Sequence, residues 1–342
     1  MTTPRNTNIE LFRFVLMCFI FFWHILVHGY DLKMLGADGY QVQGSFALMA
    51  IGLTLFAPAT YCFVFISGYY GIRFKLKKLI TLLLWCVIVS VGAKVYQYIY
   101  QGEVFHVVDF MESLLPITSN KWWFMTDFIM LYVLSPILNE GFDRLQSKEK
   151  ARILLLLCLF SFIGVALLYP NQGSSLVGLT MVYLLGRYWH TSKLGGRMSM
   201  FKSCGTFLVS FALFLTSLLV MYYASQLLHR GSIAKLIFPF LGYANPLIVV
   251  MAVSLFLMVK SLPAHANNFL NRLLSANLFI YLLTETGVFV SYRQLASEFE
   301  QGLGFALVHS FIVIGLCLLA GQVIMLVTAL LVEKCEKIFK FK

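Results

Sequence analysis

Apolar runs separated by short polar connections dominate the chain, and about ten of them reach the roughly 20 residues that a bilayer-spanning helix needs. These predicted spans lie near 9–29, 46–70, 79–101, 123–139, 152–169, 174–190, 205–228, 237–259, 276–292 and 304–332. Neither a linker nor a change in composition divides the chain, and we find no convincing internal repeat. The pattern therefore predicts an all-α, polytopic membrane protein with a single transmembrane domain over residues 1–342.

The composition supports lipid as the solvent of this chain. Of its 342 residues, 60% are hydrophobic and only 12% are charged, and the mean hydropathy is +0.82. A soluble domain is closer to half apolar and a quarter charged, so this chain has too few polar groups to cover a surface in water. The first apolar run leads into further spans without a cleavage site, so we expect no cleavable signal peptide.

Seven cysteines are scattered along the chain, mostly inside apolar runs, without paired or Cys/His spacing. We therefore expect neither disulfides nor a metal site, and we interpret these side chains as helix packing. They are Cys18, Cys62, Cys86, Cys158, Cys204, Cys317 and Cys335.

The distribution of basic residues indicates an orientation. With a cytoplasmic N-terminus, 19 of the 26 Lys and Arg residues fall in the inner connections and 5 in the outer ones, while Arg13 and Lys94 lie within spans. Cytoplasmic connections of membrane proteins carry such an excess. The pattern predicts that both termini are cytoplasmic, and it explains the net charge of +11 without nucleic acid.

The first predicted helix carries ionisable residues inside the bilayer. Arg13 and His24 are eleven residues apart, three turns plus about 20°, so they share a face and lie about 16 Å apart along the axis. Glu10 is three residues before Arg13 and is placed to pair with it, and His28 follows His24 by one turn. Such a stripe faces the bundle interior or an aqueous cavity, either as a functional site or as a structural ion pair with a buried histidine.

Four more ionisable residues fall within predicted spans. We interpret Lys94 as structural, since a lysine near a helix end reaches the membrane surface, and we interpret His309 as structural too. Asp127 either contacts a substrate hydroxyl or pairs with Lys94, and the pair is favoured. Glu285 is either a site residue or part of a buried structural pair.

Four motifs occur in order along the chain, and together they resemble the integral-membrane acyltransferase 3 family. They are Arg13, ten residues, then His24; Phe-Ile-Ser-Gly-Tyr-Tyr at 65–70; Trp-Trp-Phe at 122–124, leading to Tyr132 and Ser135; and Tyr-Leu-Leu-Gly-Arg-Tyr at 183–188. The family O-acetylates surface polysaccharides and other extracytoplasmic acceptors, and ten spans with both ends inside is its arrangement. The resemblance covers essentially the whole chain.

The resemblance implies transfer of an acyl group, most simply acetyl, from cytoplasmic acetyl-CoA to an acceptor hydroxyl at a multi-pass protein of a bacterial plasma or inner membrane. His24 and Arg13 are then the expected catalytic residues, and no tightly bound cofactor is expected. The donor's phosphates are expected at Arg13 and at the basic loop of Arg73, Lys75, Lys77 and Lys78. A carbohydrate acceptor is expected near Glu10, His28, Trp123, Asp127 and Glu285.

Three points stay open at this stage. Family members often carry a histidine where this chain has Thr284, so that histidine is either dispensable or replaced in its polar role by Glu285. Trp122 and Trp123 fit an interfacial aromatic belt better than a sugar-stacking platform. Ten spans with buried charges also suit a transporter or a flippase of a sugar-linked substrate, although neither an inverted repeat nor paired broken helices are evident.

Overall fold

The computed structural model describes residues 6–39, 42, 44–167, 175–192 and 199–339, with the side chains of 163–167 and 335–339 outside the description. Every regular element in this described part is helical, which confirms the predicted all-α fold. The α-helices are α1 (Thr7–His24), α2 (Phe46–Phe56), α3 (Ala59–Tyr70), α4 (Leu76–Tyr100), α5 (Val107–Leu114), α6 (Trp123–Arg144), α7 (Ser147–Leu167), α8 (Leu176–Thr191), α9 (Met200–Leu227), α10 (Gly231–Lys235), α11 (Ile237–Phe240), α12 (Pro246–Lys260), α13 (Asn268–Leu273), α14 (Leu278–Thr284), α15 (Tyr292–Gln301) and α16 (Leu303–Phe339).

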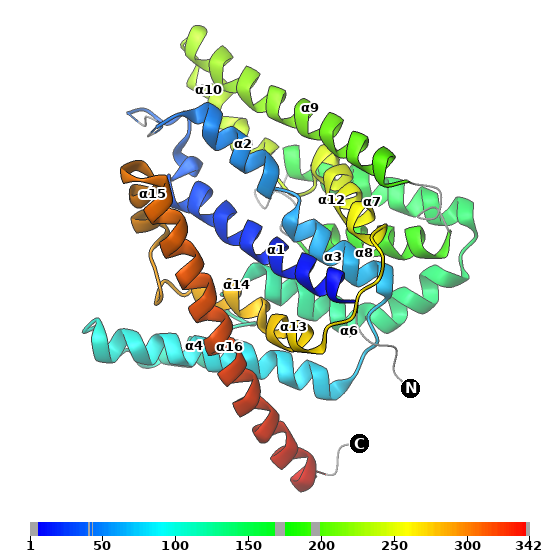
Figure 1. Cartoon of the computed structure of the whole chain (residues 1–342), viewed down its shortest axis with the longest axis vertical. Helices are drawn as coiled ribbons and strands as arrows, with labels where there is room; N and C mark the ends of the chain where they lie inside the picture. Colours follow the sequence, from blue (N-terminus) through cyan, green and yellow to red (C-terminus); the bar gives the residue numbers. More distant parts are fainter. Residues whose placement is uncertain (1–5, 40–41, 43, 168–174, 193–198, 340–342) are drawn as a thin grey trace.

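Helix α1 lies in the middle of the bundle (Figure 1). It contacts α2, α3, α12, α13 and α14, while α9 and α4 lie at opposite edges and the long α16 crosses the molecule. Leu16, Met17 and Phe21 on α1 are almost fully buried in the core. Because α1 is enclosed by other helices, its polar side chains face protein and cavities, as its stripe predicts.

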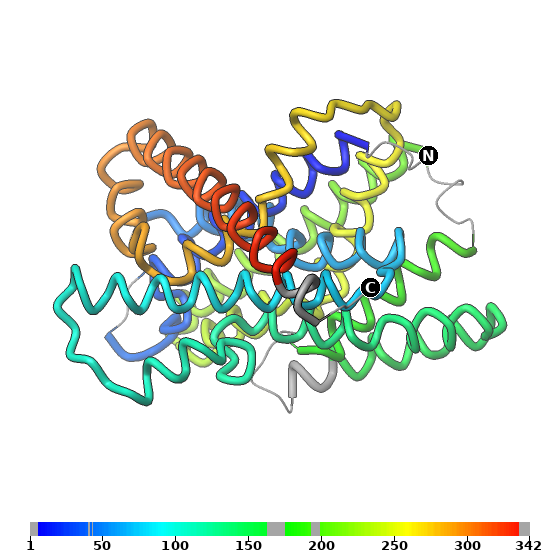
Figure 2. The backbone as a smooth tube through the Cα atoms, turned by 90° about the horizontal axis from the view of Figure 1, so that it is seen from below, coloured from blue at the N-terminus to red at the C-terminus, as the bar shows by residue number. Residues whose placement is uncertain are grey.

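The start of α1 is fixed by the segment that leads into α13. The Asn6 side chain caps the helix by accepting from the backbone N–H of Asn8 at 3.1 Å. The Thr7 N–H donates to the carbonyl of His265 at 2.7 Å, and the Asn267 N–H donates to the Thr7 hydroxyl at 2.7 Å. Figure 2 shows this segment passing beside the N-terminal end of α1.

After His24 the helix continues as a π-helix, η1 (Ile25–Gly29). Such widened turns are rare and occur frequently at functional sites. Helix α15 packs directly on η1, and a Cβ at Gly29 would lie only 2.6 Å from the backbone oxygen of Tyr292. Glycine at this position therefore permits the close approach of α15 to the end of the first helix.

Within the part of the chain that the structure describes, five helical segments are long and apolar enough to cross a membrane: Thr7–Gly29, Phe46–Tyr70, Leu76–Tyr100, Met200–Leu227 and Leu303–Lys334. This supports a multi-pass membrane protein, while ten spans and cytoplasmic termini stay predictions. The predicted ninth span, 276–292, is not one continuous helix. Within it α14 ends at Thr284, and the chain turns at Gly287, whose φ is +70°, before α15 begins at Tyr292.

Two packing predictions from the sequence are wrong. Lys94 does not pair with Asp127: its Nζ lies 2.8 Å from Glu103 and 3.6 Å from Asp109, acidic residues that follow α4 within a few turns. Trp122 does not belong to an exposed interfacial belt, because it is 1% exposed in the core. Both errors arise because sequence spacing does not say how the segment after α4 folds back.

The glycines of two motifs allow α3 and α8 to pack closely. A Cβ at Gly68 would lie 2.1 Å from the Tyr183 backbone oxygen, and one at Gly186 would lie 2.6 Å from that of Phe65. Backbones meet this closely only where small residues face each other. These motif residues therefore have a structural role, which is to bring the end of α3 against α8.

Helices α6 and α8 hold the basic loop between α3 and α4. The Tyr132 hydroxyl accepts from the Lys75 N–H at 2.9 Å, and the Tyr183 hydroxyl accepts from the Ile72 N–H at 3.0 Å and donates to Asn139 at 2.7 Å. The Asn139 amide donates to the Ile72 carbonyl at 2.9 Å. These hydrogen bonds hold the backbone of the loop in place, so its cationic side chains extend from a fixed backbone.

Candidate functional site

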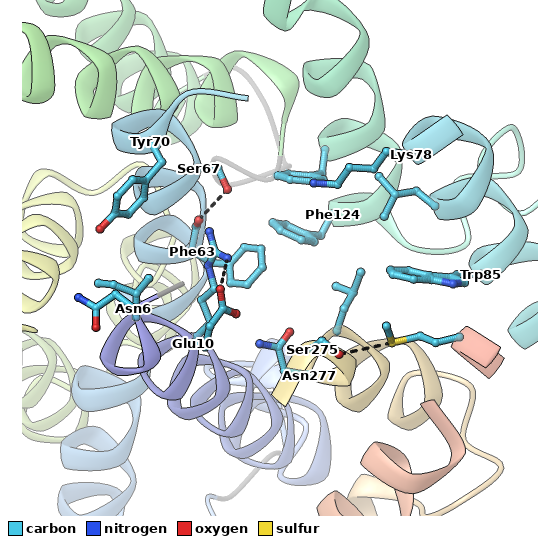
Figure 3. Close-up of a pocket in the computed structure, with 16 residues that line it drawn as sticks. Asn6, Glu10, Phe63, Ser67, Tyr70, Lys78, Trp85, Phe124, Ser275 and Asn277 are labelled. Carbon is cyan, nitrogen blue, oxygen red and sulfur yellow. Dashed lines mark hydrogen bonds and ion pairs between the residues drawn. The ribbon is translucent and has the colours of Figure 1, made fainter. Parts of the chain in front are cut away.

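A cavity of about 630 Å³, which we call the Arg13 cavity, opens beside the first half of α1. Figure 3 shows Glu10 and Tyr70 on one side of it, Trp85 on the other, and Lys78 reaching in from α4. Its polar lining comes from α1, α3, α4 and the segment before α14: Asn6, Glu10, Arg13, Ser67, Tyr70, Lys78, Ser275 and Asn277.

Arg13 is the central charge of this cavity. Its Nη1 lies 3.2 Å from Glu10 Oε1, which confirms the predicted pair, and its guanidinium lies 6.0 Å from the centroid of the Phe63 ring. Its Nε is buried and has no hydrogen-bond partner among the described residues. One carboxylate does not satisfy a guanidinium with five N–H donors, so Arg13 retains capacity for an anionic oxygen.

A second cavity, of about 540 Å³, lies at the other end of α1, and we call it the His24 cavity. Its lining is mostly polar and aromatic, and includes His24, His28, Lys33, Asn120, Trp123, Asp127, Tyr243 and Glu285. Trp123 and Tyr243 stack with ring centroids 5.4 Å apart. The His24 cavity therefore brings together predicted site residues from the second half of the first span, from α6 and from the ninth predicted span.

The closest contact in the His24 cavity joins residues far apart in the sequence. His24 Nδ1 lies 2.7 Å from Glu285 Oε1, and the imidazole is almost fully buried. The Tyr292 hydroxyl lies 3.3 Å from the same Nδ1 and donates to Glu285 Oε1 at 2.7 Å. A carboxylate on Nδ1 selects the tautomer with the proton on that nitrogen, so Nε2 is left as the basic nitrogen.

A constriction of about 10 Å³, which we call the neck, lies between the two cavities. It shares Phe124 with the Arg13 cavity, and it shares His24, Trp123 and Tyr243 with the His24 cavity. Met17, Ile20, Thr60 and Tyr281 complete its lining. The volume is about that of one water molecule, so the cavities are nearly separated, with His24 at the junction.

The structure divides the residues predicted for the site into two groups. Glu10, Arg13 and Lys78 line the Arg13 cavity, whereas His24, His28, Trp123, Asp127 and Glu285 line the His24 cavity. The side chains of Arg73, Lys75 and Lys77 are exposed and do not line either cavity. Glu285 both pairs with His24 and lines the His24 cavity, so its role as a site residue or as a structural partner stays a prediction.

Three aromatic residues at the two cavities were not predicted as site residues from the sequence: Tyr292, Tyr243 and Trp85. Tyr292 and Tyr243 end up beside His24 because α15 and the segment after α11 fold back onto the end of α1. Trp85 points from α4 into the Arg13 cavity, where its ring lies 5.1 Å from that of Phe279. Aromatic residues are common in every span of this chain, so their sequence positions carried no signal.

Comparison with known proteins identifies the family. The model of an acyltransferase domain, that of acyltransferase 3, matches residues 6–327, which include both cavities, the neck and all four motifs. No curated protein and no solved structure matches the chain. The match covers nearly the whole chain, and the chain therefore belongs to the acyltransferase 3 family of multi-pass membrane proteins.

Proposed function

We propose that this acyltransferase moves an acetyl group from cytoplasmic acetyl-CoA to a hydroxyl of a surface polysaccharide or another extracytoplasmic acceptor, in a bacterial plasma membrane. The observation that carries the proposal is the pairing of His24 with Glu285 at the junction of two cavities. A buried imidazole with an oriented tautomer is the arrangement that general-base catalysis of acyl transfer requires.

His24 supplies the chemistry at Nε2. The acceptor hydroxyl gives its proton to this nitrogen as its oxygen attacks the thioester carbonyl, an ester bond forms, the C–S bond breaks, and the departing CoA thiolate receives the proton. Glu285 stabilises the imidazolium that exists between these steps. An equivalent path forms an acyl-imidazole on Nε2 first and passes the acyl group to the acceptor in a second step.

The Arg13 cavity is the proposed donor side. CoA carries several phosphates on a long, narrow pantetheine arm, and Arg13 has a partly buried guanidinium of the kind that binds phosphate, with its Nε unpaired. Lys78 adds a second cation to the lining, and Trp85 adds an aromatic face suited to a nucleotide base. With both termini cytoplasmic, this cavity opens toward the compartment that holds CoA.

The His24 cavity is the proposed acceptor side. The stacked rings of Trp123 and Tyr243 offer an aromatic surface to the apolar face of a sugar ring. Asp127 and His28 line the same cavity and are polar partners for sugar hydroxyls. The neck then confines the meeting of donor and acceptor to the surroundings of His24.

The direct test uses the purified protein in lipid nanodiscs with acetyl-CoA and a panel of free monosaccharides. Released CoA and acetylated sugar are both measured by chromatography, because thiol reagents would label the cysteines of the chain. We expect equal amounts of the two products with at least one sugar. Absence of any protein-dependent thioester consumption would contradict the proposal and would favour a transporter instead.

A further inference from the structure

Tyr292, the first residue of α15, contacts both members of the His24–Glu285 pair. Its hydroxyl donates to Glu285 Oε1 at 2.7 Å, lies 3.3 Å from His24 Nδ1, and lies 3.2 Å from the Thr284 hydroxyl. Its ring lies 5.6 Å from the His24 ring and stacks on the His28 ring at 6.1 Å. The Tyr292 side chain thus contacts His24, Glu285 and Thr284 at the same time.

Thr284 does not compete for the hydrogen-bonding positions of Glu285. Its hydroxyl donates to the Ile280 carbonyl one turn back, at 2.6 Å. The Thr284 oxygen is an alternative acceptor for the Tyr292 hydroxyl at 3.2 Å, but the shorter bond, at 2.7 Å, goes to Glu285 Oε1, which accepts from His24 Nδ1 as well. Two donors on one oxygen fix the carboxylate in a single rotamer.

Helix α15 is itself fastened to the π-helical end of α1. The Tyr30 hydroxyl donates to the Ala296 carbonyl at 3.1 Å, and Arg293 pairs with Asp31 at 2.8 Å. Burial raises the pKa of the Tyr30 hydroxyl, which keeps its proton available for this bond. The close approach at Gly29 completes the interface, so the backbone that carries Tyr292 is held independently of the site.

We propose that Tyr292 is a positioning residue for acyl transfer, which acts through Glu285 to hold the imidazole of His24 with Nε2 directed at the reacting groups. The proposal rests on the proposed function of the His24–Glu285 pair. The Tyr292 hydroxyl lies on the Nδ1 side of the ring, so loss of this hydroxyl alone acts on the reacting groups through the orientation of His24. Misorientation of a base by a fraction of a bond length costs rate without weakening substrate binding.

The test is a double-mutant cycle of Tyr292→Phe and Glu285→Gln, assayed with acetyl-CoA and the best sugar of the monosaccharide panel. Tyr292→Phe keeps the ring contacts and removes only the hydroxyl. We expect kcat to fall about 10-fold or more with both KM values within about twofold of wild type. In the Glu285→Gln background, the same substitution should lower kcat by less than about threefold, because the carboxylate it acts on is gone.

Tyr98→Phe is the matched control, since it removes a phenol hydroxyl that donates to the His106 carbonyl, and neither residue lines either cavity. We expect it to retain kcat within about twofold, and size-exclusion chromatography should give the same elution for all variants. A wild-type kcat in Tyr292→Phe, a loss confined to KM, or a full loss repeated in the Glu285→Gln background would overturn the proposal. Failure of the wild-type protein to consume acetyl-CoA would instead overturn the proposed function.

Discussion

The two ends of α1 carry similar polar residues but are organised in different ways. In the Arg13 cavity the carboxylate that pairs with the cation is Glu10, one turn away on the same helix. In the His24 cavity the carboxylate is Glu285, which follows α14 and reaches the imidazole across the bundle. The first arrangement is local, whereas the second depends on the tertiary fold.

This difference separates binding from chemistry. A local pair leaves the Nε of Arg13 unpaired beside a cavity of about 630 Å³, which suits a large charged group. A long-range pair held by α15 orients His24 in a narrow junction, which suits a reaction between small groups. We therefore expect substitutions at the Arg13 end to change donor binding and those at the His24 end to change turnover.

The largest expected effect is at His24. His24→Ala removes the imidazole that lines the neck, and loss of a positioned base should lower kcat by about 10³-fold, near the middle of the usual range. His309→Gln is the control, because His309 pairs with Glu298 at 2.6 Å outside both cavities. Product formation is measured as acetylated sugar, with correct folding checked by size-exclusion chromatography. Wild-type turnover in His24→Ala would contradict the assignment of the chemical step to the His24 end of α1.

At the other end, Arg13→Ala should raise the KM for acetyl-CoA by about 10- to 100-fold, with a smaller change in kcat. This increase corresponds to the loss of hydrogen bonds to a charged group. The control substrate is S-acetylpantetheine, which lacks the nucleotide phosphates and should show the same KM in both proteins. The double variant Glu10→Gln/Arg13→Ala separates phosphate binding from the cost of leaving Glu10 unpaired. An equal KM increase for S-acetylpantetheine would assign Arg13 a structural role.

The sequence predicted the Arg13 end better than the His24 end, for physical reasons. Spacing within one helix determines that Glu10 and Arg13 meet, and that Arg13 and His24 share a face. The contact of Glu285 with His24 depends on the ninth segment ending early, and the ring of Tyr292 arrives only because α15 turns back. The widened turn at Ile25–Gly29 is equally invisible, since its residues also suit an ordinary helix.

The neck offers a smaller effect that joins the two ends. Ile20→Ala enlarges the lining next to His24, so the ratio of kcat/KM for butyryl-CoA over acetyl-CoA should rise about 10-fold, a typical value for methylene discrimination. Ile66→Ala is the control, because Ile66 is fully buried but does not line either cavity or the neck. The rates for both donors are measured on each protein. An unchanged ratio in Ile20→Ala would place the acyl group elsewhere.

The smallest expected effect is at the basic loop outside the Arg13 cavity. Lys75 is held by its backbone to Tyr132, and its exposed side chain acts on an approaching polyphosphate only through solvent. Lys75→Gln should therefore raise the KM for acetyl-CoA by less than about threefold at low salt, and the difference should vanish near 0.15 M salt, where the Debye length is about 8 Å. The KM is measured at both ionic strengths beside Arg13→Ala, whose effect should persist because the group is partly buried. If Lys75→Gln matched Arg13→Ala at high salt, the donor's phosphates would lie on the loop, and the Arg13 cavity would lose its proposed role.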